Sequence, residues 1–348
     1  LFIVILFVGV HSSNAQQNLT LNEAIKIALK NSYDVQLVSN NLAIAKNNNS
    51  LGVAGALPTI AATANDNKSL TTIQQNFADP SRNTTKSGVE GNVLTAGLTA
   101  SVVLFNGYRI MAAKERLATL EKQNGLLLKA QMQNTAAIVM QQYYNVVRQQ
   151  AYLKTIEKSI EASQQRLSIV KTRQQIGVAN QTDFLQSSLD LNALLQAKQN
   201  QLIVIAQAKD DLINSMAMPT DAIRNITIDD SIQVDTKILF EGKEKSVVAG
   251  ISENPQLRAL SQQVSINQII EKETKALLYP TLRASTGYNV NSNSSAAGFS
   301  LLNETYGPFL GVNLAIPIYG GGAAKKNLKN ARINTKTAAI QSASATRE

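Results

Sequence analysis

The stretch from Arg109 to Gln175 constrains this chain most, because it contains no proline and a single glycine, Gly125. In its second half, apolar residues and one serine recur in alternating steps of three and four, at Leu153, Ile156, Ile160, Ser163, Leu167 and Val170. Such a seam is typical of helices that pack in a coiled coil. A helix over the whole stretch would be roughly 100 Å long. The stretch therefore predicts a spanning rod, longer than a globular core needs.

The residues that follow predict a turn and a shorter return helix. Gly177 can end the first helix in the left-handed conformation, and Thr182 or Asp183 can cap the next helix. The return helix would end before Pro219 and measure roughly 50 Å. A further helical segment is expected from Tyr33 to Leu57. Stacked end to end, the two shorter helices could pair with the long one along its length.

An internal duplication organises the chain. The segment LPTI at 57–60 recurs as YPTL at 279–282, so that Pro58 corresponds to Pro280. Upstream, Tyr33 has its counterpart in Pro255 at the same displacement. Downstream, LFNG at 104–107 is matched by IYGG at 318–321, at a slightly shorter displacement. A constant offset that changes within one loop indicates a repeated unit.

After each of these prolines the hydrophobic period changes to two. In the second copy, every other residue is apolar, with Thr286 as the exception, at Leu282, Ala284, Thr286, Tyr288 and Val290 and again at Leu310, Val312, Leu314, Ile316 and Ile318. The first copy alternates more loosely. We expect two strands within 58–107 and two within 280–319. An apolar face and a small or polar face suit strands between lipid and water.

Four strands cannot close a membrane barrel, since the smallest such barrels have about eight. An open edge in lipid would leave backbone N–H and C=O groups without partners. If the strands lie in a membrane, several chains must share one barrel. The soluble alternative is a small hairpin packed on a helical bundle.

The composition argues against an enzyme. The chain has no cysteine and a single histidine, His11. His11 lies within residues 1–15, which we expect to be removed as a signal peptide. The mature chain would then lack the commonest nucleophilic, acid–base and zinc-binding side chains. The net charge of +9 is spread along the chain, without the clustered basic stripe of a nucleic-acid-binding surface. We predict no catalytic residue, no cofactor, no metal site and no nucleic-acid partner.

The first residues predict a secretory signal. An apolar run from Leu1 to Val10 is followed by small residues up to Ala15. We expect residues 1–15 to be a partial signal peptide, cut after Ala15. A capping-box pattern from Thr20 to Glu23 then predicts the start of the first helix.

The turn region adds a last motif, QIGV at 175–178 followed by TDFL at 182–185. Taken in their order, spacing and duplication from Leu19 to the end, these motifs resemble the TolC-type family of outer-membrane efflux proteins. The resemblance implies a homotrimer that is mainly α with membrane β. Long antiparallel helical hairpins would form an α-barrel, and four strands from each protomer would form one shared twelve-stranded β-barrel.

The resemblance also implies a function without bond chemistry. Substrates would pass passively from an inner-membrane pump and a periplasmic adaptor protein to the exterior of a Gram-negative bacterium. The chain would lie in the cell outer membrane, in contact with its lipid, and extend into the periplasm. The first repeat would cover residues 16–250, with the long hairpin at 109–216 and an equatorial segment at 219–250. The second repeat would cover 251–348.

Candidate site residues follow from the same resemblance. The periplasmic tip, where the adaptor docks and the entrance is held closed, would include Gly177, Val178, Thr182 and Asp183. Gly177 and Asp183 can equally be no more than a helix stop and a helix cap. The transitions from barrel to helix would lie at Phe105, Asn106, Gly107, Tyr319, Gly320 and Gly321. The helix-to-strand turns would lie at Pro58 and Pro280.

The second copy departs from the family pattern. Glu348 corresponds to Asn134 of the first copy, so the second long hairpin would have barely begun. We expect the sequence to be part of a longer chain at both ends. The rival hypothesis is a non-conducting coiled-coil scaffold or interaction protein, and an enzyme is a third.

Overall fold

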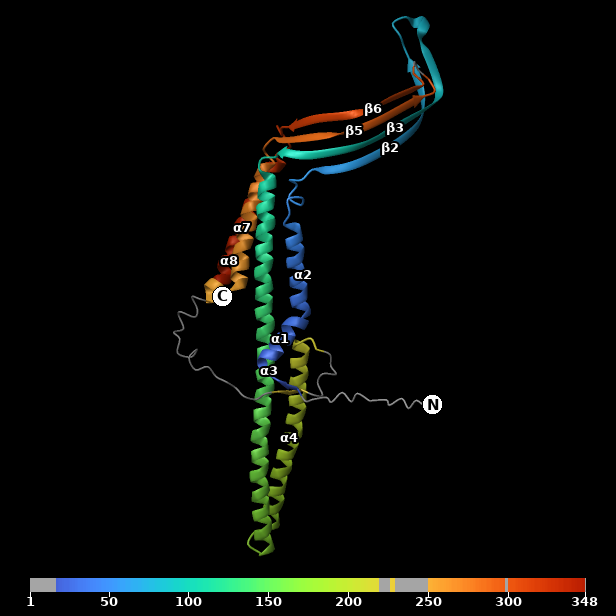
Figure 1. Cartoon of the computed structure of the whole chain (residues 1–348). Helices are drawn as coiled ribbons and strands as arrows, with labels where there is room; N and C mark the ends of the chain where they lie inside the picture. Colours follow the sequence, from blue (N-terminus) through green and yellow to red (C-terminus); the bar gives the residue numbers. More distant parts are fainter. Residues whose placement is uncertain (1–16, 219–225, 229–249, 298–299, 348) are drawn as a thin grey trace, which may run out of the picture. The chain divides into compact units, whose positions relative to one another are not determined.

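The computed structural model describes residues 17–218, 226–228, 250–297 and 300–347 (Figure 1). Within these ranges the chain is mainly helical with a four-stranded antiparallel sheet, so the predicted combination of long helices and four strands is confirmed. The chain divides into two compact units. The first contains the described residues up to Asn41 and those from Leu126 to Pro255, and the second contains Leu42–Gly125 and the residues from Gln256 onward.

The helices include the predicted long hairpin. Helix α3 (Arg109–Gln175) is a single helix of 67 residues, and α4 (Gln181–Ser215) lies alongside it in the first unit (Figure 1). The Gln201 amide of α4 donates to the carbonyl oxygen of Gln149 at 3.1 Å. Lys198 of α4 pairs with Glu157 at 2.8 Å. None of the described helices combines the length and the apolar composition that crossing a lipid bilayer would require.

The core of the first unit forms where α1 (Leu21–Asn31) packs on this hairpin. Two three-residue strands, β1 (Gln17–Leu19) and β4 (Ile226–Ile228), pair in parallel beside it. The buried residues of this core are Leu19, Ala24, Ala28, Val139, Tyr143, Val146, Val147, Ala208, Leu212, Ile213, Met216 and Ile228. The Tyr143 hydroxyl donates to the carbonyl oxygen of Leu19 at 3.0 Å, which satisfies the polar end of a buried ring.

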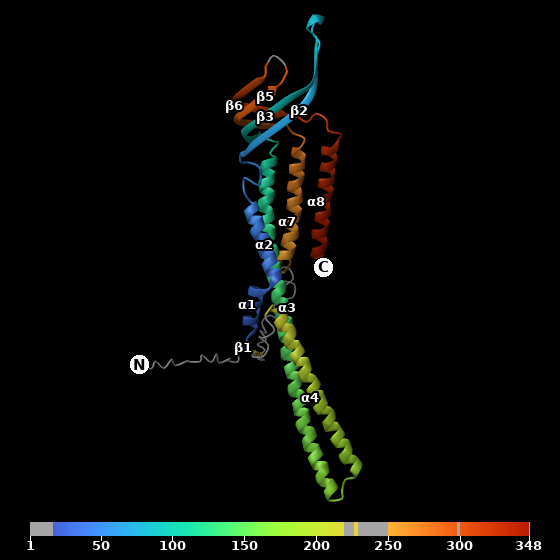
Figure 2. The same cartoon turned by 90° about the vertical axis from the view of Figure 1, so that its right-hand side faces the viewer.

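The second unit contains the sheet. Its strands are β2 (Thr59–Gln75), β3 (Thr84–Phe105), β5 (Thr281–Ser295) and β6 (Leu302–Ala315). They lie in the order β2-β3-β5-β6, every neighbouring pair is antiparallel, and together they form one curved sheet (Figures 1 and 2). A 3-10 turn, η1 (Pro80–Arg82), lies between β2 and β3, which continue beyond the ends of β5 and β6. One sheet thus joins strands from both halves of the chain.

The elements recur at the displacements found in the sequence. Helix α2 (Tyr33–Asn48) begins at Tyr33, and α7 (Pro255–Ala276) begins at its counterpart. The first residues of β2 and β5 correspond in the same way, each directly after its proline. Helix α8 (Ala323–Arg347) begins at the counterpart of the first residue of α3. Equivalent sequence positions therefore begin equivalent elements.

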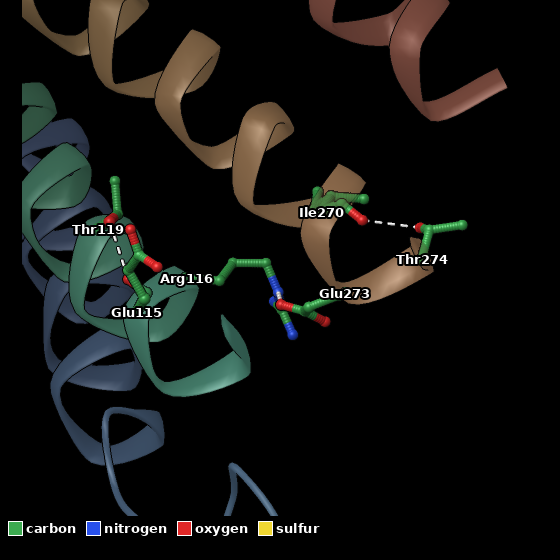
Figure 3. A network of polar contacts seen from close by, with 6 residues as sticks. All are labelled: Glu115, Arg116, Thr119, Ile270, Glu273 and Thr274. Atoms are coloured by element: carbon green, nitrogen blue, oxygen red, sulfur yellow. Dashed lines mark hydrogen bonds and ion pairs between the residues drawn. The ribbon is translucent and has the colours of Figure 1, made fainter. Parts of the chain in front are cut away.

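Ion pairs join the helices of the second unit. Arg116 of α3 donates through Nε to Glu273 Oε1 of α7 at 2.6 Å, and Figure 3 shows this pair bridging the two helices. The flanking Thr119 and Thr274 hydroxyls donate to carbonyl oxygens one turn earlier in their own helices. Arg332 of α8 pairs with Glu271 of α7 at 3.7 Å.

Two predicted element ends are wrong. Helix α2 ends at Asn48 rather than near Leu57, because the Asn49 carbonyl accepts a hydrogen bond from Lys114 of α3 at 3.1 Å and its side-chain amide donates to Glu121 at 2.6 Å. Strand β6 ends at Ala315 rather than at Ile318, and Pro317 has no N–H with which to continue the ladder. The predicted signal peptide at 1–15 lies outside the described residues, as does most of the segment 219–250.

The capping box at the start of α1 makes the stability of this helix depend on pH. The Glu23 carboxylate accepts hydrogen bonds from the backbone N–H of Thr20 at 3.1 Å and from its hydroxyl at 2.9 Å. These bonds, the backbone one first, lower the pKa of Glu23 below its ordinary value of 4.5. The ionised Glu23 carboxylate therefore stabilises the folded protein fully above pH 4.5. This stabilisation is lost as the pH falls through the lower pKa that Glu23 has in the folded state.

We expect Glu23→Gln to reduce the loss of thermal stability between about pH 6 and about pH 3, because glutamine does not titrate. The measurement is the helical circular-dichroism signal on heating. Glu161→Gln, at an exposed position of α3, is the matched control and should behave as the wild type. If the Glu23→Gln protein lost as much thermal stability as the wild type over this pH range, the Glu23 capping box would not be a source of the pH dependence.

Candidate functional site

One face of the sheet is apolar across all four strands. Directly opposed residues of an antiparallel pair point to the same side of a sheet, so Leu98 shares a face with its partners Ala62 and Tyr288. The register extends this face over Ile60, Ala62 and Ala64 of β2, Leu94, Ala96, Leu98, Ala100 and Val102 of β3, Leu282, Ala284, Thr286, Tyr288 and Val290 of β5, and Tyr306, Pro308, Leu310, Val312 and Leu314 of β6. Leu310 is 82% exposed and Tyr306 is 73% exposed. Most large side chains of this apolar face are thus exposed within the part of the chain that the structure describes.

The apolar stretch is long enough to cross most of the apolar band of a membrane barrel. From Leu282 to Val290, β5 runs roughly 26 Å along the strand at 3.3 Å per residue, which a barrel tilt of about 40° reduces to a height of roughly 20 Å, against ~25 Å for the band. Beyond this band, at the end of the sheet away from the helices, the same face becomes charged at Asp66, Lys68, Glu90 and Glu304.

The opposite face carries small and polar side chains. Gly287 sits where a Cβ atom would lie 2.1 Å from the Leu98 carbonyl oxygen and 2.9 Å from the Phe309 ring. A larger residue there would push β3, β5 and Phe309 apart. The face is compatible with water, and its small residues let the strands approach closely.

The sheet has two unpaired edges. Strand β2 pairs only with β3, and β6 pairs only with β5 among the described strands. Each edge therefore presents a row of backbone donors and acceptors beside an exposed apolar face. In lipid those groups must be satisfied by another strand.

The strand-to-helix transitions of the two copies share one backbone geometry. Gly107 and Tyr108 have φ of 67° and 66°, and Gly321 and Gly322 have φ of 62° and 75°. Two consecutive left-handed residues thus turn the chain from the sheet into α3 and towards α8. The predicted Gly107 and Gly321 are the first member of each pair.

Two of the other predicted transition residues support the turn before α3. Asn106 accepts a hydrogen bond through Oδ1 from the Ile110 N–H at 3.3 Å and so caps the helix. A bulge between Val103 and Phe105 brings Phe105 opposite Leu282, on the apolar face. The Phe105 ring then packs edge-on against Tyr108, with centroids 5.6 Å apart. An aromatic pair at the end of an apolar band is typical of a membrane–water boundary.

The predicted helix-to-strand prolines also lie in this region. Pro58 and Pro280 immediately precede the first residues of β2 and β5, a position that does not need their missing N–H. The turn between α7 and Pro280 packs against Gly107. A Cβ atom added to Gly107 would lie 2.7 Å from Tyr279 Cβ and 3.0 Å from the Ala276 carbonyl oxygen. Tyr319 and Gly320, by contrast, are exposed.

The turn between α3 and α4 is a well-defined helix stop and start. Gly177 has φ of 78°, and its N–H donates to the Gln174 carbonyl at 3.0 Å. The Val178 N–H donates to the Arg173 carbonyl at 2.8 Å, which completes a Schellman motif. The predicted left-handed stop at Gly177 is confirmed.

The predicted cap of α4 is wrong by a few residues. Asn180, not Thr182 or Asp183, is the N-cap, and its side chain accepts the Asp183 N–H at 2.8 Å. The Asp183 carboxylate in turn accepts the Asn180 N–H, because a capping box needs its acidic residue three positions after the cap. Gly177 and Asp183 therefore have structural roles. Val178 and Thr182 are exposed.

Sequence reasoning missed two residues of these turns. Tyr108 adopts a left-handed conformation that is unfavourable for a tyrosine, and the repeat could have revealed it, because the counterpart in the second copy is Gly322. Asn180 could have been found as the residue three positions before Asp183.

Comparison with known proteins identifies the family. A family model described as outer membrane efflux protein matches residues 24–216, more than half of the chain. The chain belongs to the outer membrane efflux protein family. It is therefore a channel protein of the Gram-negative outer membrane that extends into the periplasm, and not an enzyme. Membership of the family implies a trimeric channel that works with a tripartite pump. No individually curated protein sequence matches this chain.

Solved channel structures share the fold. The VceC outer membrane protein of Vibrio cholerae superposes with a TM-score of 0.72 at 14% identity, covering 94% of this chain and 75% of that one. The CmeC outer membrane channel of Campylobacter jejuni gives 0.70 at 17% identity, covering 93% and 67%. The open MtrE outer membrane channel of Neisseria gonorrhoeae gives 0.61 at 18% identity, covering 94% and 70%. At these identities the likeness concerns the fold.

We expect Gly107→Ala to destabilise the protein more than Gly321→Ala. Both positions have positive φ, which costs an alanine about 1–2 kcal/mol. Only at Gly107 would the new methyl group also overlap Tyr279, which adds about 1–3 kcal/mol, whereas nothing lies within 4 Å at Gly321. Guanidinium unfolding followed by circular dichroism measures the difference. Equal losses for the two variants would refute the close approach at Gly107.

Proposed function

We propose that the chain is one protomer of a homotrimeric outer-membrane channel that passively conducts substrates to the exterior. Four strands from each of three copies would close a twelve-stranded barrel around a water-filled lumen. The apolar face of the sheet would contact lipid, and the small, polar face would line the lumen.

The observation that carries this proposal is the pair of unpaired edges beside an exposed apolar face. Because successive strands alternate in direction, β6 runs opposite to β2. The β6 edge of one copy can therefore pair with the β2 edge of the next copy and continue the antiparallel ladder. Three copies reach a strand number at which a barrel encloses a lumen, whereas one copy would leave both edges unsatisfied in lipid.

We also propose that the turn between α3 and α4 docks a periplasmic adaptor that hands on substrates from an inner-membrane pump. Apolar side chains gather around this turn without cover: Ile176 is 68% exposed, Val178 63% and Leu185 52%. The Schellman motif and the capping box hold the turn in one conformation, so its exposed residues form a preorganised surface.

Cysteine pairs test the shared barrel, since the natural chain contains no cysteine. Ala62→Cys on β2 is combined in turn with Leu310→Cys and Val312→Cys on β6, which lie on the same face of the sheet. We expect oxidation to yield disulfide-linked trimers in outer-membrane extracts, and the uncrosslinked protein to give single-channel conductance in planar bilayers.

Phe309→Cys, on the opposite face of β6, is the matched control and should not crosslink to Ala62→Cys. Disulfides that form only within single chains would contradict the shared barrel. Disulfide-linked trimers that show no conductance would contradict the channel and favour the non-conducting scaffold.

Docking at the tip is tested by site-directed photo-crosslinking from Val178→Cys and Thr182→Cys carrying a thiol-linked photoprobe. We expect a periplasmic adaptor, identified by mass spectrometry, to be captured from both positions because both side chains are exposed beside the preorganised turn. Tyr152→Cys, on an exposed part of α3 away from the turn, is the control. Capture of the adaptor from Tyr152 alone would place docking elsewhere.

A further inference from the structure

The polar face of the sheet is almost free of charge. The strand register assigns to this face alternate residues of β2 from Thr59 to Thr71, of β3 from Val89 to Val103, and their counterparts in β5 and β6. Within these described segments, Arg283 of β5 is the only charged residue on the face. It lies opposite Val103 and Asn313, one residue pair from the end of the β3–β5 ladder and two pairs from the end of the β5–β6 ladder, at the end of the sheet that meets the helices.

A hollow of about 660 Å³ lies beside Arg283 at the junction of sheet and helices. Its charged lining residues are Arg283, Arg109 at the start of α3, and the pair Arg116 and Glu273. Glu273 neutralises Arg116 through their 2.6 Å ion pair (Figure 3). Arg109 and Arg283 are both exposed, and among the described residues neither has an acidic partner within ion-pair distance. Among the described residues that line it, this hollow therefore carries two positive charges per chain that no acidic side chain neutralises.

The duplication indicates that the fold does not require these arginines. Arg283 corresponds to Ala61 in the first copy, and Arg109 corresponds to Ala323 in the second. Both alanines occupy the same place in a strand or helix that the arginine occupies in the other copy. A position that accepts alanine in one copy does not need a guanidinium group to form a strand or to begin a helix. The positive charges of Arg283 and Arg109 are therefore not explained by a requirement of the fold.

We propose that Arg283 and Arg109 form a basic ring at the base of the barrel that favours anionic cargo over cationic cargo. This inference rests on the proposed trimeric channel, in which three copies would place six guanidinium groups around one lumen. Rings of arginine or lysine make pores selective for anions, and low-dielectric walls strengthen the field of such a ring. The preferred substrates would be organic anions that carry carboxylate, phosphate or sulfonate groups.

The test is the ion selectivity of single channels of the full-length protein, measured as the reversal potential in a KCl gradient. We expect Arg283→Ala to lower the permeability ratio of chloride to potassium by roughly threefold or more. The double variant that carries both Arg283→Ala and Arg109→Ala should have a still lower ratio. Arg283→Lys, which keeps the charge, should retain the wild-type ratio. The effect should weaken as the salt concentration rises, because ions screen the ring.

Lys68→Ala is the matched control, since it removes one positive charge from the opposite face of the same sheet and should leave the ratio unchanged. Alanine is already present at position 61, so Arg283→Ala is expected to fold, and trimer yield in the outer membrane checks this. Conducting channels whose ratio is the same in wild type and Arg283→Ala would overturn the basic ring. An absence of conductance in the wild type would instead overturn the proposed channel.

Discussion

The structure depends on the need of every backbone N–H and C=O group in lipid for a hydrogen-bond partner. Strands β2, β3, β5 and β6 satisfy one another internally, but the outer edges of β2 and β6 do not. An exposed apolar face beside two open edges is unstable in water and incomplete in a membrane. In the proposed barrel, association of several copies around a closed ladder would remove both problems at once, and it would explain how a channel can be built from four strands per chain.

The second determinant is the duplicated connection between sheet and helix. Consecutive left-handed residues at Gly107 and Tyr108, and at Gly321 and Gly322, turn the chain from the sheet towards the next helix. Gly107 also packs against the turn that leads into β5, so a strand-to-helix turn of one copy supports a helix-to-strand turn of the other. The two halves of the sheet are therefore joined where strands give way to helices. Arg109 and Arg283 lie at the same place, and neither has an acidic partner among the residues that the structure describes.

Much of the architecture could be predicted from sequence because its signals are long and periodic. The proline-free stretch of α3 and the alternation in β5 each extend over many residues, so local exceptions do not obscure them. Element ends were less predictable. The end of α2 is set by hydrogen bonds to Lys114 and Glu121, which are distant in sequence. The N-cap of α4 is Asn180, because Asp183 is the acidic residue of the capping box at the third helical position and not the cap itself.

The sequence by itself determined the lengths of α3 and α4, the presence of four strands, the duplication and the absence of cysteine, since each is a property of composition or local spacing. Only the tertiary structure decided how the strands are ordered and which residues share a face, because strand pairing is a long-range choice. That pairing places β3 beside β5 and leaves β2 and β6 at the edges. It also shows that Arg283 is the only charged residue on the polar face within the described segments Thr59–Thr71, Val89–Val103 and their counterparts in β5 and β6, which becomes visible once four strands are set in register.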